Sequence, residues 1–76
     1  MPLSGKERRW LKTFGANVRR ERSARGWTQD QLAERADLAT RNLQKVEAGE
    51  LNILFTTVTR IHQALRCSWR RLMPLE

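Results

Sequence analysis

Four polar side chains fall on one face of the segment 40–48 if that segment is helical: Thr40, Arg41, Gln44 and Lys45. At about 100° per residue they cover an arc of about 140°, and Leu43 and Val46 point away from it. Guanidinium and ammonium groups donate to guanine edges, an amide pairs with adenine, and a threonine methyl contacts thymine. The spacing therefore favours a helix face that contacts base edges in a DNA major groove. An ordinary solvated helix face is the alternative.

Helical periodicity extends over the rest of the chain. Apolar residues recur every three or four positions over residues 6–25, and Gly26 then offers a left-handed stop. The run from Thr28 to Gln31 is a capping box, which begins a second helix. No alternating apolar run bounded by turns predicts a strand. We therefore expect an all-α chain with helices at residues 6–25, 29–36, 40–48, 54–65 and 69–73.

Two of these predicted helices are short and adjacent. Residues 37–39 separate them, because no apolar period crosses these positions and Asp37 tolerates a left-handed backbone. Two short helices joined by a three-residue turn have the length of a helix-turn-helix, here at residues 28–49. The sequence thus predicts one domain over residues 1–76 that contains this motif.

Two charged residues interrupt apolar faces. Arg22 continues the apolar stripe of the first predicted helix, and Glu47 follows Leu43 on the third. An unpaired buried charge costs several kcal/mol, so we expect the two residues to form a structural ion pair between these helices. Glu21 and Arg25, four residues apart, are expected to form an ordinary exposed contact instead.

Composition limits the class of protein. The 76 residues suit one small domain, and a formal charge of +7 favours a polyanionic partner such as nucleic acid. One cysteine, Cys67, and one histidine, His62, are too few for a disulfide framework or a zinc site. Acid–base catalysis needs convergent groups, and paired carboxylates are missing. We therefore expect no enzyme activity, no metal and no cofactor.

The distribution of apolar and charged residues indicates where the chain acts. No run of about 18 apolar residues could span a membrane, and the N-terminal stretch lacks the apolar core of a secretory signal. We expect a cytoplasmic protein without membrane contacts. Residues 26–53 carry three basic and five acidic side chains, against eight and two in residues 6–25. Non-specific attraction to phosphates must therefore come from the first helix, including Arg19, and from the C-terminal turn.

Several spaced motifs carry a family resemblance: Phe14 to Arg19, Gly26 to Gln29, Leu32-Ala33, Leu43, Val46-Glu47 and Gly49. With these residues the chain resembles the phage-repressor-like (Cro/repressor, XRE) helix-turn-helix family. The resemblance implies a five-helix, lambda-repressor-like DNA-binding domain that places helix 40–48 in the major groove, usually as a symmetric dimer on a palindromic operator. Asp37 and Ala39 depart from the family, which usually has a turn glycine and a Ser or Thr cap there.

The resemblance also implies contacts to the DNA backbone. Gln29 begins the second helix, where exposed amides and the positive helix end favour a phosphate. A plain helix-start role for Gln29 and a plain turn role for Asn52 are the alternatives. The predicted phosphate contacts are Gln29, Thr28, Asn52 and Arg19.

The fourth predicted helix is apolar around more than one face. One domain of this size cannot bury both faces, so the surplus favours an isologous dimer surface within residues 51–73. A wide core stripe is the alternative. The predicted interface residues are Leu51, Leu54, Phe55, Val58 and Trp69.

Together these features predict a transcriptional regulator that binds a palindromic operator in double-stranded DNA as a homodimer. The stretch from Gly49 to Asn52 is similar to that of restriction–modification controller proteins, which regulate their own operon. An antitoxin of a toxin–antitoxin pair and a small phage repressor keep the same fold and remain open as alternatives. A toxin and RNA polymerase are therefore further candidate partners.

Overall fold

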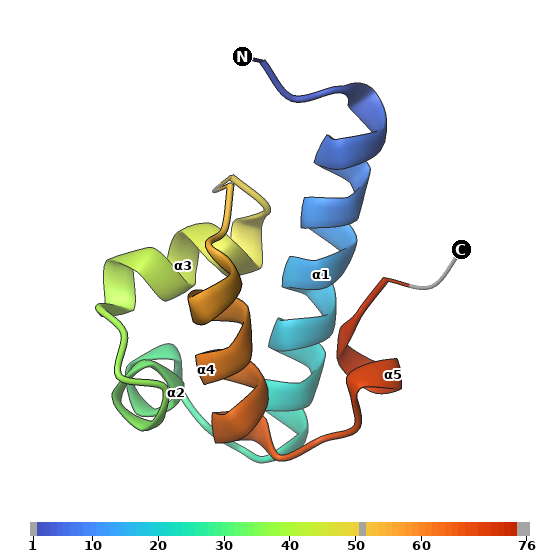
Figure 1. The fold of residues 1–76 in the computed structure, drawn as a ribbon. Coiled ribbons are helices and arrows are strands. Elements are labelled where there is room, and N and C mark those ends of the chain that lie inside the picture. Colours follow the sequence, from blue (N-terminus) through green and yellow to red (C-terminus); the bar gives the residue numbers. More distant parts are fainter. Residues whose placement is uncertain (1, 51, 75–76) are drawn as a thin grey trace.

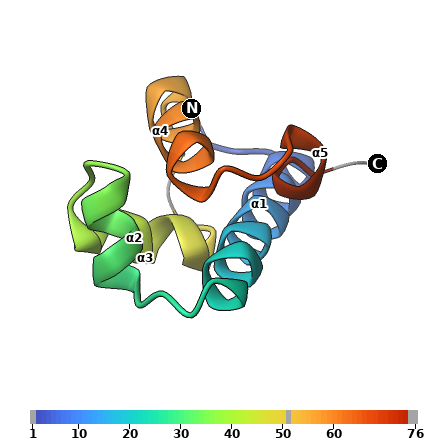
Figure 2. The same cartoon turned by 90° about the horizontal axis from the view of Figure 1, so that it is seen from below.

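The computed structural model describes residues 2–50 and 52–74, and the regular secondary structure within them is all helical, as predicted (Figure 1). α1 packs directly against α3, α4 packs against α1 and α2, and α5 packs against α1 on the flank away from α2 (Figures 1 and 2). No helix of this described part has the length and hydropathy that a bilayer-spanning segment requires. The helices are α1 (Gly5–Ala24), α2 (Gln29–Arg35), α3 (Thr40–Ala48), α4 (Phe55–Leu65) and α5 (Trp69–Leu72).

Capping groups fix where the first two helices begin. Thr28 Oγ1 accepts a hydrogen bond from the Gln31 backbone N–H at 3.1 Å, and Gln31 Oε1 accepts one from the Thr28 N–H at 2.8 Å. The predicted capping box is therefore present. Ser4 and Glu7 exchange the same two bonds at 3.1 and 2.8 Å, so α1 begins one residue earlier than the periodicity indicates.

The turn between α2 and α3 forms without the turn glycine and the Ser or Thr cap that are usual in the family. Asp37 adopts φ +56°, the left-handed conformation that the sequence predicts for it. Ala39 occupies the N-cap position of α3 and makes no side-chain hydrogen bond to the helix. The missing cap costs on the order of 1 kcal/mol, which packing behind α3 must offset.

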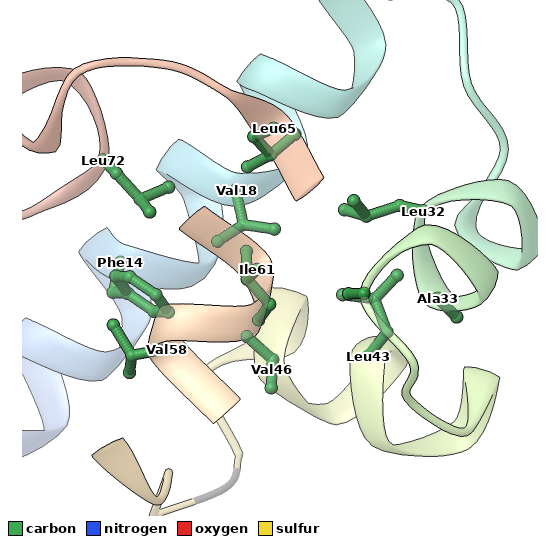
Figure 3. Packing of buried hydrophobic residues seen from close by; sticks show 11 residues of the cluster. Phe14, Val18, Leu32, Ala33, Leu43, Val46, Val58, Ile61, Leu65 and Leu72 are labelled. Atoms are coloured by element: carbon green, nitrogen blue, oxygen red, sulfur yellow. The ribbon is translucent and has the colours of Figure 1, made fainter. Parts of the chain in front are cut away.

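The core holds α3 from behind. Figure 3 shows its apolar side chains, which come from all five described helices and are at most 6% exposed. Each buried valine, leucine, isoleucine or phenylalanine side chain contributes about 1.5–3 kcal/mol by its removal from water. On α3 the core residues are Leu43 and Val46, both with no exposed surface. The core is made of Phe14, Val18, Leu32, Ala33, Ala36, Leu43, Val46, Val58, Ile61, Leu65 and Leu72.

Glu21 is buried at 2% exposure, so the prediction of an ordinary exposed contact with Arg25 is wrong. Its carboxylate accepts hydrogen bonds from Arg25 at 3.1 Å and from Arg71 and Arg20 at 3.2 Å. Burial alone raises the pKa of Glu21, but these hydrogen bonds outweigh burial and lower the pKa below its ordinary value. The ionised carboxylate therefore stabilises the fold above the unfolded-state pKa, and this contribution is lost as the pH falls through the folded-state pKa. Because Arg71 lies on α5, Glu21 also fastens α5 to α1.

Candidate nucleic-acid interface

The outward face of α3 is polar. Arg41, Gln44 and Lys45 are exposed, while Leu43 and Val46 on the opposite side are fully buried. Three of the four predicted base-contacting residues thus lie together on the solvent side. The face offers a guanidinium, an amide and an ammonium group, which are donors suited to base edges.

Thr40 lies at the edge of this face and is half-buried. Its hydroxyl donates to Asp30 Oδ1 at 2.7 Å, which joins the first residue of α3 to the first turn of α2. The hydroxyl proton of Thr40 is therefore engaged within the protein. The methyl group of Thr40 remains available for the predicted contact with DNA. Asn42 is also exposed on α3, but the sequence argument missed it because it falls about 60° outside the arc.

A buried ion pair fixes the back of α3. Arg22 Nε donates to Glu47 Oε2 at 2.7 Å and Arg22 Nη2 donates to Glu47 Oε1 at 3.0 Å, so the predicted pair is present and bidentate. The side chain of Glu47 is 4% exposed and that of Arg22 is 13% exposed. Arg22 also donates to the Trp27 carbonyl at 2.8 Å, and Gln29 Nε2 donates to Glu47 Oε1 at 3.0 Å. Glu47 therefore connects α3 with both α1 and the start of α2.

Two glycines let α1 and α3 approach closely. A Cβ atom on Gly15 of α1 would overlap the Val46 carbonyl oxygen and lie 2.8 Å from that of Glu47. Gly49 ends α3 at φ +73°, and a Cβ there would lie 2.8 Å from the Cα of Lys12. The position of α3 thus depends on backbone contact with α1 as well as on the ion pair.

A hollow opens beside α3, between α1 and the start of α2. This hollow is bordered by three of the four predicted phosphate-contacting residues: Thr28, Gln29 and Arg19. Gln44 of the polar face borders it as well. The hollow is lined by Arg19, Arg22, Thr28, Gln29, Gln44, Glu47 and Ala48.

These predicted phosphate-contacting residues differ in which hydrogen-bond donors remain free for a phosphate. Arg19 is exposed, whereas the Gln29 amide already donates to Glu47 and the Thr28 oxygen caps α2. Asn52 lines a different, apolar groove, so the structure does not bring it to the hollow.

A second surface is apolar. Leu54 and Phe55 are 72% and 77% exposed, and Trp69 is 42% exposed. Val58 is only 6% exposed and packs in the core, so it offers a partner little of the surface predicted for it, although it also lines an apolar groove. Leu51, the remaining predicted interface residue, lies outside the described residues.

The apolar surface includes a shallow groove between the start of α1, the segment before α4, and α5. Phe55 and Trp69 line this groove together with Trp10, Ile53 and Met73. The Trp69 ring stacks on His62, with centroids 3.6 Å apart and planes at 11°. His62 thus packs against Trp69 and holds its ring at the edge of the groove.

Comparison with known proteins identifies the family to which the chain belongs. The helix-turn-helix family profile matches residues 18–72, which include α2, α3 and α4. The chain belongs to the phage-repressor-like (XRE) helix-turn-helix family. This helix-turn-helix protein is therefore a DNA-binding regulator and not an enzyme.

A solved structure shows which members of the family the chain is similar to. The helix-turn-helix chain is similar to the crystal structure of the restriction-modification controller protein C.AhdI from Aeromonas hydrophila, with a TM-score of 0.78 and 30% sequence identity. The match covers 83% of this chain and 96% of that one. No curated protein sequence gives a significant match. The five-helix, lambda-repressor-like fold expected from the sequence is thus confirmed.

Proposed function

We propose that this regulator binds a palindromic operator as a homodimer, with α3 of each copy in a major groove and half-sites about one DNA turn apart. The observation that carries the proposal is the outward face of α3, where Arg41, Gln44 and Lys45 are exposed above a buried back. Thr40 adds a methyl group at the edge of this face. A rigid recognition helix needs support of this kind, because base contacts require fixed geometry.

Backbone contacts set the register of the protein on DNA. We assign them to the Arg19 guanidinium and to the backbone amide of Gln29, which border the hollow beside α3. Thr28 is left out because its backbone amide donates to Gln31 and its hydroxyl oxygen caps α2. The side-chain amide of Gln29 is left out because it donates to Glu47. Asn52 is left out because it lies in the apolar groove.

Dimerisation is assigned to the apolar surface. Leu54, Phe55 and Trp69 are the large apolar side chains that stay exposed among the described residues, and Phe55 and Trp69 line the apolar groove. A two-fold contact through this surface would bury the same residues from both copies.

The similar controller protein is named for restriction–modification. The identity and coverage of that match support a role for this chain in controlling a restriction–modification operon in the cytoplasm. Flanking methyltransferase and endonuclease genes are the expected genomic context, and a flanking toxin gene in their place would contradict it.

Affinity for DNA is expected to depend steeply on salt. If a dimer neutralises about eight phosphates, the slope of log affinity against log salt concentration is expected to lie near −7. Fluorescence anisotropy with a labelled duplex, repeated between about 50 and 300 mM salt, measures this slope. A slope near zero would exclude binding driven by phosphate contacts.

Substitution Phe55→Glu is expected to weaken the homodimer by about 100-fold or more, because burying a phenylalanine contributes about 1.5–3 kcal/mol and each dimer loses two. Sedimentation equilibrium measures the dissociation constant. The neighbouring Thr56→Glu variant adds the same charge at another exposed position and is the control, expected to stay within a few-fold of the parent. Equal losses in both variants would show that charge, and not the apolar surface, governs association.

A further inference from the structure

A hollow at one end of the molecule combines arginines with a tryptophan and contains no residue of α3. It lies between the C-terminal ends of α1 and α4 and one side of α2, at the end that Figure 2 views. None of the predicted base, phosphate or dimer contacts belongs to it. Its main residues are Arg25, Trp27, Arg35, Gln63, Ala64 and Arg66.

Trp27 holds the arginines of this hollow in place. The guanidinium carbon of Arg35 lies 4.3 Å from the centroid of the Trp27 ring, and that of Arg25 lies 5.9 Å from it. A guanidinium over an aromatic face keeps its N–H donors directed outward in its own plane, where a carboxylate can accept two of them. The indole therefore orders a binding group that would otherwise lose side-chain entropy on binding.

Two of the arginines lack a partner of opposite charge. Arg25 pairs with Glu21 at 3.1 Å, but neither Arg35 nor Arg66 forms an ion pair within residues 2–50 and 52–74. Both side chains are exposed. The site thus has a positive charge that the described residues leave available to a ligand.

The basic surface continues beyond this hollow. A second hollow shares Arg35, Gln63 and Ala64 with the first and adds Arg60, with Asp37 as an acidic residue in its lining. Together the two hollows form one basic surface, which we call the arginine strip: Arg25, Arg35, Arg60 and Arg66, with the Trp27 ring beside Arg25 and Arg35. Guanidinium groups spread over two adjoining hollows can pair with several carboxylates of one chain.

We propose that the arginine strip docks an acidic segment of a protein partner, whose carboxylates pair with Arg35 and Arg66. A protein segment is favoured over nucleic acid because two guanidinium groups already occupy the space over the Trp27 ring, where a base would have to stack. The apolar Ala64 between the arginines accommodates an aliphatic side chain of the same segment. The proposal does not depend on dimerisation or on operator binding, since no residue of the strip takes part in either.

The test uses a six-residue peptide, acetyl-Glu-Leu-Glu-Glu-Leu-Glu-amide, and the indole N–H signals of the three tryptophans in a nitrogen-15 NMR spectrum. The Trp27 signal is assigned by its disappearance in Trp27→Phe. We expect the peptide to shift this signal saturably. The double variant Arg35→Gln, Arg66→Gln is expected to bind the peptide about 10-fold more weakly, since two charge-assisted contacts are lost.

The control is Arg8→Gln, Arg9→Gln, which removes the same charge from exposed positions on α1 and is expected to bind the peptide within about two-fold of the parent. If loss of Arg35 disturbs the Trp27 ring, Arg66→Gln alone is expected to weaken binding by about three-fold with an unchanged spectrum of the free protein. Equal weakening by both double variants, or no peptide binding, would overturn the proposal. A short random DNA duplex that shifts the Trp27 signal as strongly as the peptide does would also overturn it.

Discussion

Substitution Glu47→Ala is expected to lower the free energy of unfolding by about 3–5 kcal/mol, the usual loss when one partner of a buried ion pair is removed. The Arg22 guanidinium would keep its charge at 13% exposure, and the Gln29 amide would lose its acceptor. A domain of this length has a total stability of about 4–11 kcal/mol, so the variant should be close to unfolding at 37 °C. Urea denaturation followed by circular dichroism measures the change.

The matched control for this substitution is Glu50→Ala. Glu50 is exposed and forms no ion pair with the described residues, so its removal is expected to change stability by less than about 0.5 kcal/mol. Similar losses in the two variants would contradict a specific role for the Arg22–Glu47 pair.

Substitution Gly15→Ala is expected to destabilise the protein by about 3 kcal/mol, at the upper end of what overpacking costs. Helix propensity alone predicts the opposite sign, a gain of about 1 kcal/mol for alanine over glycine inside a helix. The steric term should win because the added Cβ would meet backbone oxygens of Val46 and Glu47, which cannot rotate away as side chains do. α3 would have to move away from α1. Thermal unfolding of the variant shows which term dominates.

Gly5→Ala provides the comparison within the same helix. No atom lies within 4 Å of the Cβ position at Gly5, so only the propensity term applies and the melting temperature should stay the same or rise. A Gly15→Ala variant as stable as Gly5→Ala would mean that α1 and α3 are not in backbone contact.

The sequence predicted the helices and the supports of α3 well, because these depend on local periodicity. Both Arg22 and Glu47 interrupt apolar faces, and burial of two such residues requires that they pair. The left-handed Asp37 and the capping box at Thr28 are likewise local features that a short segment determines.

Features that depend on distant segments were missed. The sequence predicted that Glu21 forms an exposed ion pair with Arg25. Nothing near Glu21 in sequence indicates that Arg71, 50 residues later, donates a hydrogen bond to its carboxylate. The bond from Thr40 to Asp30 depends on how α2 and α3 cross, which the length of the turn alone does not determine. Val58 lay on two overlapping apolar stripes, and only the packing of α4 against the core decides which side it faces.

Sequence preference is the most direct test of the claim that the exposed face of α3 reads base edges. A selection from random duplexes, followed by affinity measurements on selected and random DNA, gives the specificity ratio. Arg41→Ala is expected to lower this ratio by about 10-fold or more with an unchanged melting temperature, since a bidentate base contact discriminates by about 1–3 kcal/mol. Arg19→Ala, which removes a proposed phosphate contact, is expected to weaken binding to both DNAs equally and leave the ratio intact. An Arg41→Ala protein that keeps the full ratio would contradict this assignment of α3.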